Sequence, residues 1–189
     1  MSGKDTQGLR LVEALKGHFL SSGEIIREME AEILKSGAGT AHSAEGNLIP
    51  TDLFYEWVLP YFGKHHLSDS PLVLSSIGRW HGEEEKVMAH AHTAGHPMKA
   101  VVWLTISEDE AHRRWTAAKQ LGDRGERPDD QHKAIFHKRI REFHEKTMPV
   151  LDYYDELDLL LRVNGENAHD DVFAEMIDAL HDFTKRWRW

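Results

Sequence analysis

Three short apolar runs alternate along the chain with stretches in which apolar residues recur every three or four positions. Two runs, residues 71–76 (PLVLSS) and 100–106 (AVVWLTI), are continuous, which is typical of strands buried on both faces of a sheet. Residues 159–163 (LLLRV) form a third, less uniform run. Buried strands that alternate with amphipathic helices predict an α/β fold with helical crossovers.

The helical patterns have recognisable ends. Gly17 closes the first pattern, and Ser107 with Glu110 forms a capping box that places a helix directly after the run at 100–106. We expect helices over residues 6–16, 22–34 and 51–57, from 107 onward, from 129 or 130 onward, and over 170–183, with a short extended piece at 18–20 and loops at 36–47 and 121–128.

Length and composition limit the classes of function. The 189 residues fit one domain, and the net charge of -9 argues against DNA or RNA as a ligand while allowing a small phosphate held by local arginines. The absence of cysteine excludes disulfides, thiolate zinc sites and cysteine nucleophiles. No apolar run is long enough to span a bilayer or to form a secretory signal, so a cytoplasmic location is expected.

Histidines and carboxylates offer little support for a metal site within the protein. The spacing of His90, His92 and His96 does not bring three imidazoles to one helical face, so we expect them to be solvated. We expect the same of Glu84 and Glu85, whereas Trp57, Trp103 and Trp115 lie in apolar surroundings and are expected in the core.

The first residues contain part of a phosphate-binding pattern. Ser2-Gly3-Lys4-Asp5-Thr6-Gln7 stands directly before a helix, where amide groups and a lysine can hold phosphates. In the full pattern G-x-x-x-x-G-K, Gly3 and Lys4 are the last two residues, so the first glycine and its feeding strand would lie before Met1. Taken alone, these residues are better explained as a polar N-terminal tail.

The segments that follow make the phosphate-binding interpretation stronger. The order SGKDTQ, amphipathic helix, LSSGEIIRE resembles GSGKGTQ and LSTGDLLRE of the adenylate kinase family of nucleoside monophosphate kinases. Further matches in the same order are residues 46–50 (GNLIP), 75–79 (SSIGR), 126–130 (ERPDD), 138–140 (KRI), 147–154 (TMPVLDYY) and 163–165 (VNG). The resemblance therefore covers roughly the whole chain.

The resemblance implies a three-layer α/β/α P-loop NTPase fold with a parallel sheet whose first strand is apparently missing. Residues 1–189 would form one nucleoside-monophosphate-kinase-like domain, with a nucleotide-binding insertion at 21–50 and a short lid at 119–129. The implied activity is transfer of a phosphoryl group from ATP to a nucleoside monophosphate, AMP first, by a monomer with Mg²⁺ bound to ATP. Two alternatives remain open: a catalytically impaired nucleotide-binding or interaction protein of the same fold, and a kinase for another acceptor such as GMP.

The resemblance also assigns expected roles to individual residues. Charge neutralisation in phosphoryl transfer is assigned to Lys4, Arg79, Arg127 and Arg139. The residues expected to bind ATP are Ser2, Gly3, Lys4, Asp5, Thr6, Asn167 and either Arg113 or Arg114, with Arg124 as an additional arginine of the lid. The residues expected to bind the monophosphate acceptor are Ser22, Arg27, Asn47, Leu48, Ile49, Arg79, Glu83, Arg127 and Arg139.

Four residues depart from the family pattern. Asp5 replaces a glycine beside the triphosphate, and Ser75 replaces an aspartate that helps organise the metal's water shell. Gly78 replaces a proline, which is expected to loosen its turn, and Glu83 replaces a glutamine that contacts the adenine edge. Because an ionised carboxylate only accepts hydrogen bonds, Glu83 suits guanine better than adenine, and the acceptor base stays open.

Overall fold

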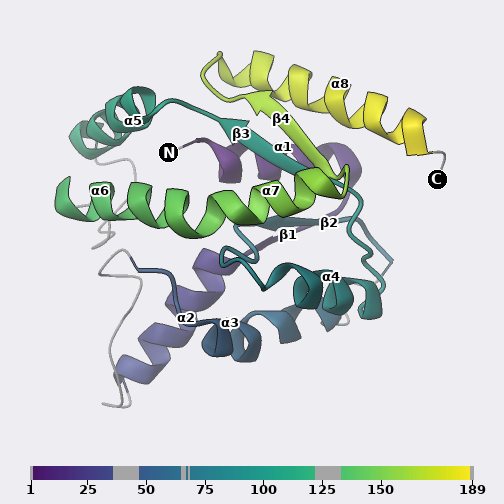
Figure 1. The fold of residues 1–189 in the computed structure, drawn as a ribbon, viewed down its shortest axis with the longest axis horizontal. Helices are drawn as coiled ribbons and strands as arrows, with labels where there is room; N and C mark the ends of the chain where they lie inside the picture. The colour runs from purple at the N-terminus through teal and green to yellow at the C-terminus, as the bar shows by residue number, and fades with distance from the viewer. Residues whose placement is uncertain (1, 36–46, 65–66, 68, 122–132, 188–189) are drawn as a thin grey trace.

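The computed structural model describes residues 2–35, 47–64, 67, 69–121 and 133–187 (Figure 1). The predicted loops at 36–47 and 121–128, the start of the helix expected at 129 or 130, and the lid arginines Arg124 and Arg127 lie largely or wholly outside these residues. In chain order the elements are α1 Lys4–Leu15, β1 His18–Ser21, α2 Ser22–Lys35, α3 Thr51–Trp57, a 3₁₀ turn Leu59–Gly63, β2 Leu72–Ser75, α4 Glu84–Thr93, β3 Val101–Thr105, α5 Glu108–Leu121, α6 Lys133–Glu142, a π-helical turn Phe143–Thr147, α7 Met148–Glu156, β4 Leu160–Asn164 and α8 His169–Trp187.

The four described strands form two parallel pairs. In one pair β1 aligns with β2 from His18 opposite Leu72, and in the other β3 aligns with β4 from Val101 opposite Leu160. Parallel neighbours require a crossover connection, and here helices supply it. The predicted α/β P-loop fold with parallel strands is confirmed, but the described strands form two separate pairs and not one continuous sheet.

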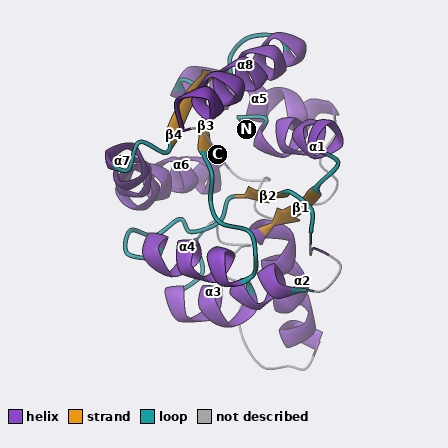
Figure 2. Cartoon of the chain, turned by 90° about the vertical axis from the view of Figure 1, so that its right-hand side faces the viewer, coloured by secondary structure: helices purple, strands orange, loops and turns teal. Residues whose placement is uncertain are grey.

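Helices cover both faces of the strands. On one face, α1 packs on β2 and α8 packs on β4, and these two helices also touch each other. Figure 2 shows α2, α3 and α4 gathered on the far side of β1 and β2, with α8 at the opposite end of the molecule. The resulting arrangement is helix, strand, helix, as the resemblance implied.

Four apolar clusters lie among the described residues, one of which packs α5 against α6, and the other three hold these layers together. The largest lies between β1, β2 and the helices α2 to α4, and it includes the fully buried Val58 and Val87. A second joins α1, β3, β4 and α8 through Leu11, Val163 and Met176. The third packs α7 against β3 and β4. Trp57 and Trp115 are buried as predicted, whereas Trp103 is only partly buried.

One buried carboxylate contradicts the sequence analysis. Glu84, which we expected to be solvated, is 2% exposed, whereas Glu85 is exposed. The Glu84 carboxylate accepts a hydrogen bond from the Gly82 backbone N–H at 2.6 Å and lies 2.9 Å from Nδ1 of His81. The prediction failed because these partners become close only when the turn before α4 forms.

The described residues contain neither a group of side chains suited to a metal ion nor a membrane-spanning helix. Within them, no group of three or more acidic or histidine side chains is placed to hold a metal ion. No helix among these residues combines the length and apolarity needed to cross a membrane.

Candidate active site

The site begins at the N-terminus of α1. Gly3 directly precedes the helix with φ of 85°, a left-handed conformation that glycine adopts readily, and its carbonyl accepts the Gln7 backbone N–H at 3.0 Å. The first amide groups of a helix have no partner within it and carry the positive end of the helix dipole. A helix start with a lysine in its first position can therefore hold an anion.

Asp5 joins the start of α1 to the end of β2. Its carboxylate lies 2.9 Å from the ammonium of Lys4 and accepts a hydrogen bond of 2.6 Å from the Ser75 hydroxyl. Both side chains depart from the family pattern, and the structure places them in contact. The negative charge at position 5 is therefore held against Lys4 and the end of β2.

Lys4, Arg79 and Arg139 lie close enough to repel one another. Desolvation by surrounding protein lowers the pKa of Lys4, the Asp5 carboxylate opposes this, and the charges of Arg79 and Arg139 lower it further. Burial, and then repulsion by Arg139, lower the pKa of Arg79 to about 10, although Glu142 and Glu83 act in the opposite direction. Three cations from α1, from the turn after β2 and from α6 thus converge, and we call these residues the basic cluster.

The turn that presents Arg79 depends on Gly78 and Glu83. Gly78 has φ of 60°, which proline cannot adopt, so the glycine fixes a different turn and does not merely loosen it. One oxygen of Glu83, Oε2, accepts the backbone N–H groups of Arg79 at 3.0 Å and Trp80 at 3.2 Å. Glu83 is therefore the structural centre of this turn.

Glu83 also has an oxygen available for another group. The residue is 1% exposed, and its Oε1 makes no hydrogen bond within the described part of the chain. Burial raises the pKa of the carboxyl, while Thr51 and the backbone N–H groups of Trp80 and Arg79 lower it less strongly. Since Thr51 follows directly after residues 47–50, Glu83 lies beside the segment that we expect to hold the acceptor.

The remaining residues expected at the acceptor come from α2 and from residues 47–49. The Ser22 hydroxyl, at the start of α2, donates to the Ser76 carbonyl at 2.6 Å. The guanidinium of Arg27 lies back over the same helix start, close to Gly23. The Ile49 carbonyl accepts the indole N–H of Trp80 at 3.1 Å, so the segment 47–49 is fastened to the Arg79 turn.

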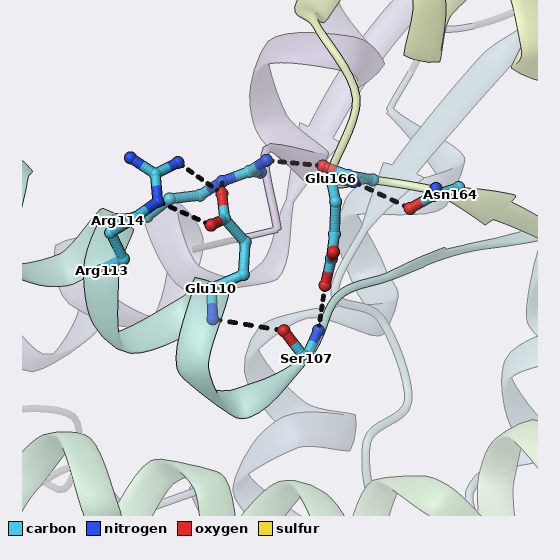
Figure 3. Close-up of polar contacts among 7 residues, drawn as sticks. Ser107, Glu110, Arg113, Arg114, Asn164 and Glu166 are labelled. Atoms are coloured by element: carbon cyan, nitrogen blue, oxygen red, sulfur yellow. Dashed lines mark hydrogen bonds and ion pairs between the residues drawn. The ribbon is translucent and has the colours of Figure 1, made fainter.

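The residues expected at the donor base form a network between α5 and the loop after β4 (Figure 3). Glu110 accepts two hydrogen bonds from Arg113 and one from Arg114, and these bonds lower the pKa of its carboxyl to about 2. Arg114 also donates to the Gly165 carbonyl at 2.8 Å, whereas the Arg113 side chain is 69% exposed. Of the two arginines that the sequence left open, Arg114 is therefore the one joined to this loop, which contains the exposed Asn167.

The capping box at the start of α5 is only half formed. The Glu110 backbone N–H donates to the Ser107 hydroxyl at 3.3 Å, as expected. The Ser107 backbone N–H, however, donates to Glu166 from the loop after β4 at 2.7 Å, and not to Glu110. The Glu110 carboxylate is consequently free of the cap and holds the two arginines.

Sequence reasoning missed two side chains that contact the Arg79 turn. Trp80 lies directly after Arg79, and the ammonium of Lys146 is 4.0 Å from the centroid of its ring. Lys146 is seven positions after Arg139, a spacing that returns to the same face of a helix and was the available signal.

A surface hollow lies elsewhere. Its volume is about 190 Å³, and it is lined by residues of β1, α2 and the turn after α3, including Glu24, Glu28 and Tyr61. None of the basic cluster lines it. The wall carries two carboxylates and only one cation, Lys64, so it suits a phosphate less well than the basic cluster, where we place the candidate site.

In a comparison with known proteins, the relatives found are adenylate kinases. The chain is 27% identical over 180 residues to adenylate kinase 2 of Nostoc, spanning 95% of this chain and 93% of the relative. It is 28% identical to the adenylate kinase of Thermus thermophilus, with 95% and 91% covered, and 26% identical to adenylate kinase isoenzyme 1 of Caenorhabditis elegans, with 98% and 85% covered. No family model matches the chain. The chain is nevertheless similar over nearly its full length to several adenylate kinases.

Proposed function

We propose that this protein is a nucleoside monophosphate kinase that transfers the terminal phosphoryl group of ATP to AMP. An oxygen of the acceptor phosphate forms the new bond to phosphorus, the bond to the ADP leaving oxygen breaks, and two molecules of ADP result. The acceptor phosphate is already anionic, so the reaction needs no side-chain general base. Such a transfer depends on positioning and on neutralising the charge of the phosphate oxygens.

The observation that carries this proposal is the basic cluster beside the start of α1. Lys4, Arg79 and Arg139 hold their charges against mutual repulsion and partial desolvation, as the lowered pKa values of Lys4 and Arg79 indicate. A polyphosphate between them replaces repulsion by attraction, since charge-assisted hydrogen bonds to phosphate are among the strongest in proteins. We assign donor phosphates to Lys4 and the α1 amides, and acceptor contacts to Arg79, Arg139, Ser22 and Arg27.

Other parts of the assignment rest on the family pattern. Arg127 is proposed to join Arg139 around the transferred group, and residues 119–129 to act as a short lid that excludes water. Residues 21–50 are proposed as the acceptor-binding insertion, with the backbone of 47–49 beside the base. Arg114 and Asn167 are proposed to border the donor base.

The residues present fit a magnesium ion that arrives with ATP. Mg²⁺ prefers oxygen ligands, keeps several waters and is usually held by one or two carboxylates plus substrate phosphates. Asp5 and Ser75 supply one carboxylate and one hydroxyl, 2.6 Å apart, next to Lys4. When bound, the ion would neutralise part of the triphosphate charge, and Asp5 with Ser75 would orient its water shell.

The acceptor base has a second candidate because of Glu83. An ionised carboxyl at Oε1 accepts only and suits the N–H donors of guanine, whereas a protonated carboxyl also donates and suits the donor and acceptor edge of adenine. Burial raises the pKa of Glu83 and so favours the protonated form. AMP is the first acceptor because of the similarity to adenylate kinases, and GMP stays the alternative because an ionised Glu83 suits guanine.

A coupled assay of ADP formation tests the proposal. Purified protein is given ATP and Mg²⁺ with AMP, GMP, CMP, UMP or dTMP, and AMP should give the highest kcat/KM. Removal of Mg²⁺ with EDTA should abolish turnover, and titrating Mg²⁺ back should restore it.

Calorimetry of ATP and AMP binding distinguishes the rival function. Binding of both nucleotides without turnover would identify a catalytically impaired nucleotide-binding protein. Absence of binding as well would refute the proposed site.

A further inference from the structure

Trp80 occupies a position between two parts of the candidate site. Its indole N–H donates to the Ile49 carbonyl at 3.1 Å, on the segment assigned to the acceptor. The face of the same ring receives the ammonium of Lys146 at 4.0 Å, from the π-helical turn that follows α6. One side chain therefore contacts both the acceptor segment and the continuation of the helix that carries Arg139.

The contact with the π-helical turn is reinforced on both sides. Lys146 forms an ion pair with Glu142, the last residue of α6, and only 24% of its side chain is exposed. The next residue, Thr147, donates from its hydroxyl to the Arg79 carbonyl at 3.2 Å. Two consecutive residues of the turn thus hold two consecutive residues, Arg79 and Trp80. Single π-helical turns inside α-helices occur frequently at functional sites.

The backbone of Trp80 is fixed as well. Its N–H donates to Oε2 of the buried Glu83, together with the N–H of Arg79. The ring therefore projects from a turn that is held by hydrogen bonds. A shift of the segment 47–49 must either move the indole or break its hydrogen bond to the Ile49 carbonyl. The Ile49 carbonyl has a second lone pair, so it can accept the indole N–H while a nucleotide base lies beside it.

We propose that Trp80 is a positioning residue that couples the acceptor-binding segment to α6, so that Arg139 is aligned when the acceptor is bound. This inference rests on the proposed kinase function. Trp80 acts through Ile49 on one side and through Lys146 on the other, and it does not itself contact the transferred phosphoryl group.

Trp80→Phe and Lys146→Met test the two sides of the coupling. Trp80→Phe keeps an aromatic face for Lys146 and removes the hydrogen bond to Ile49, so KM for AMP should rise about 5–10-fold while KM for ATP stays unchanged. Lys146→Met removes the cation and should lower kcat about 5–10-fold, and Lys146→Arg should restore it. Combining Trp80→Phe with Lys146→Met should give less than the product of the single effects, because the two side chains act in one pathway.

Trp103→Phe is the matched control. It makes the same chemical change in β3, packed beside α7, and should leave both KM values and kcat unaltered. Equal changes in all variants, a loss of melting temperature without a KM or kcat effect, or full additivity of the double variant would overturn the coupling.

A fluorescence measurement separates failure of this inference from failure of the proposed function. The difference between wild-type and Trp80→Phe emission should change when AMP is added and stay constant when ATP alone is added. If wild-type protein turns over ATP and AMP but the difference signal and KM do not respond, the coupling is wrong while the kinase assignment stands. If wild-type protein neither binds nor phosphorylates a nucleoside monophosphate, the proposed function itself is wrong.

Discussion

Replacement of Arg79 by methionine should make the protein more stable and its nucleotide complex weaker. The lowering of the Arg79 pKa to about 10 corresponds to roughly 3 kcal/mol of unfavourable free energy in keeping the guanidinium charged in the folded protein. The causes are burial first and repulsion by Arg139 second, and methionine removes both. Part of the gain is lost with the attraction to Glu142 and Glu83, so we expect a net stabilisation of about 1–2 kcal/mol.

The sign of this effect follows from proton linkage. Below about pH 10 the arginine is charged in both the folded and the unfolded protein, so the destabilisation is complete and independent of pH. It declines only as the pH rises above about 10, where the folded protein loses the proton before the unfolded protein does. At neutral pH the melting temperature of Arg79→Met should therefore be about 2–8 °C above that of wild type.

Thermal denaturation with and without ligand measures both halves of the prediction. The stabilisation of wild type by ATP with AMP should be largely lost in Arg79→Met, because a charge-assisted hydrogen bond to phosphate contributes about 1.5–3 kcal/mol, or roughly 10–100-fold in affinity. Arg162→Met is the control, since Arg162 pairs with Asp155 on the surface outside the site and should change neither quantity appreciably. An Arg79→Met protein that is less stable than wild type, or that keeps the full ligand effect, would refute the reasoning.

Three further outcomes are expected. In wild type, affinity for AMP measured by calorimetry should fall as pH rises through the raised pKa of Glu83, above 4.5, because the protonated carboxyl is lost, and Glu83→Gln should remove this dependence. Arg114→Met should raise KM for ATP about 5–10-fold by releasing the Gly165 loop. Arg113→Met also removes an ion pair with Glu110 but no contact with the loop, so it should leave KM for ATP unchanged. Gly78→Ala should lower the free energy of unfolding by about 1–3 kcal/mol in urea denaturation, since φ is 60° and the new methyl would lie 3.1 Å from Val87, while Gly63→Ala, in open space, should have little effect.

The sequence predicted the elements that buried surface determines. The continuous apolar runs at 71–76 and 100–106 became β2 and β3 with ends within one residue, because strands covered on both faces leave few polar positions. Helix α4 was not predicted, since Glu84–Thr93 is rich in charge and histidine and only Val87 and Ala91 anchor it fully in the core. Folding decided the rest: the turn before α4 brings the Gly82 N–H to the buried Glu84, and the Gly165 carbonyl, 51 positions away in sequence, is contacted by Arg114 and not by Arg113.

Acidic and basic side chains around the site have different partners, and this difference has a physical consequence. Glu83 and Glu84 accept backbone N–H groups of their own turn, and Glu110 accepts the arginines of its own helix, so these carboxylates stabilise the fold without a ligand. Lys4, Arg79 and Arg139 are brought together by the fold although they repel one another. Asp5 offsets part of this repulsion at Lys4, and Glu142 and Glu83 offset part of it at Arg79, yet the pKa of both groups stays lowered, and bound phosphates would counter that effect. Because a ligand stabilises only the state that it binds, the stability of this protein should depend on nucleotide concentration more strongly than on any single surface ion pair.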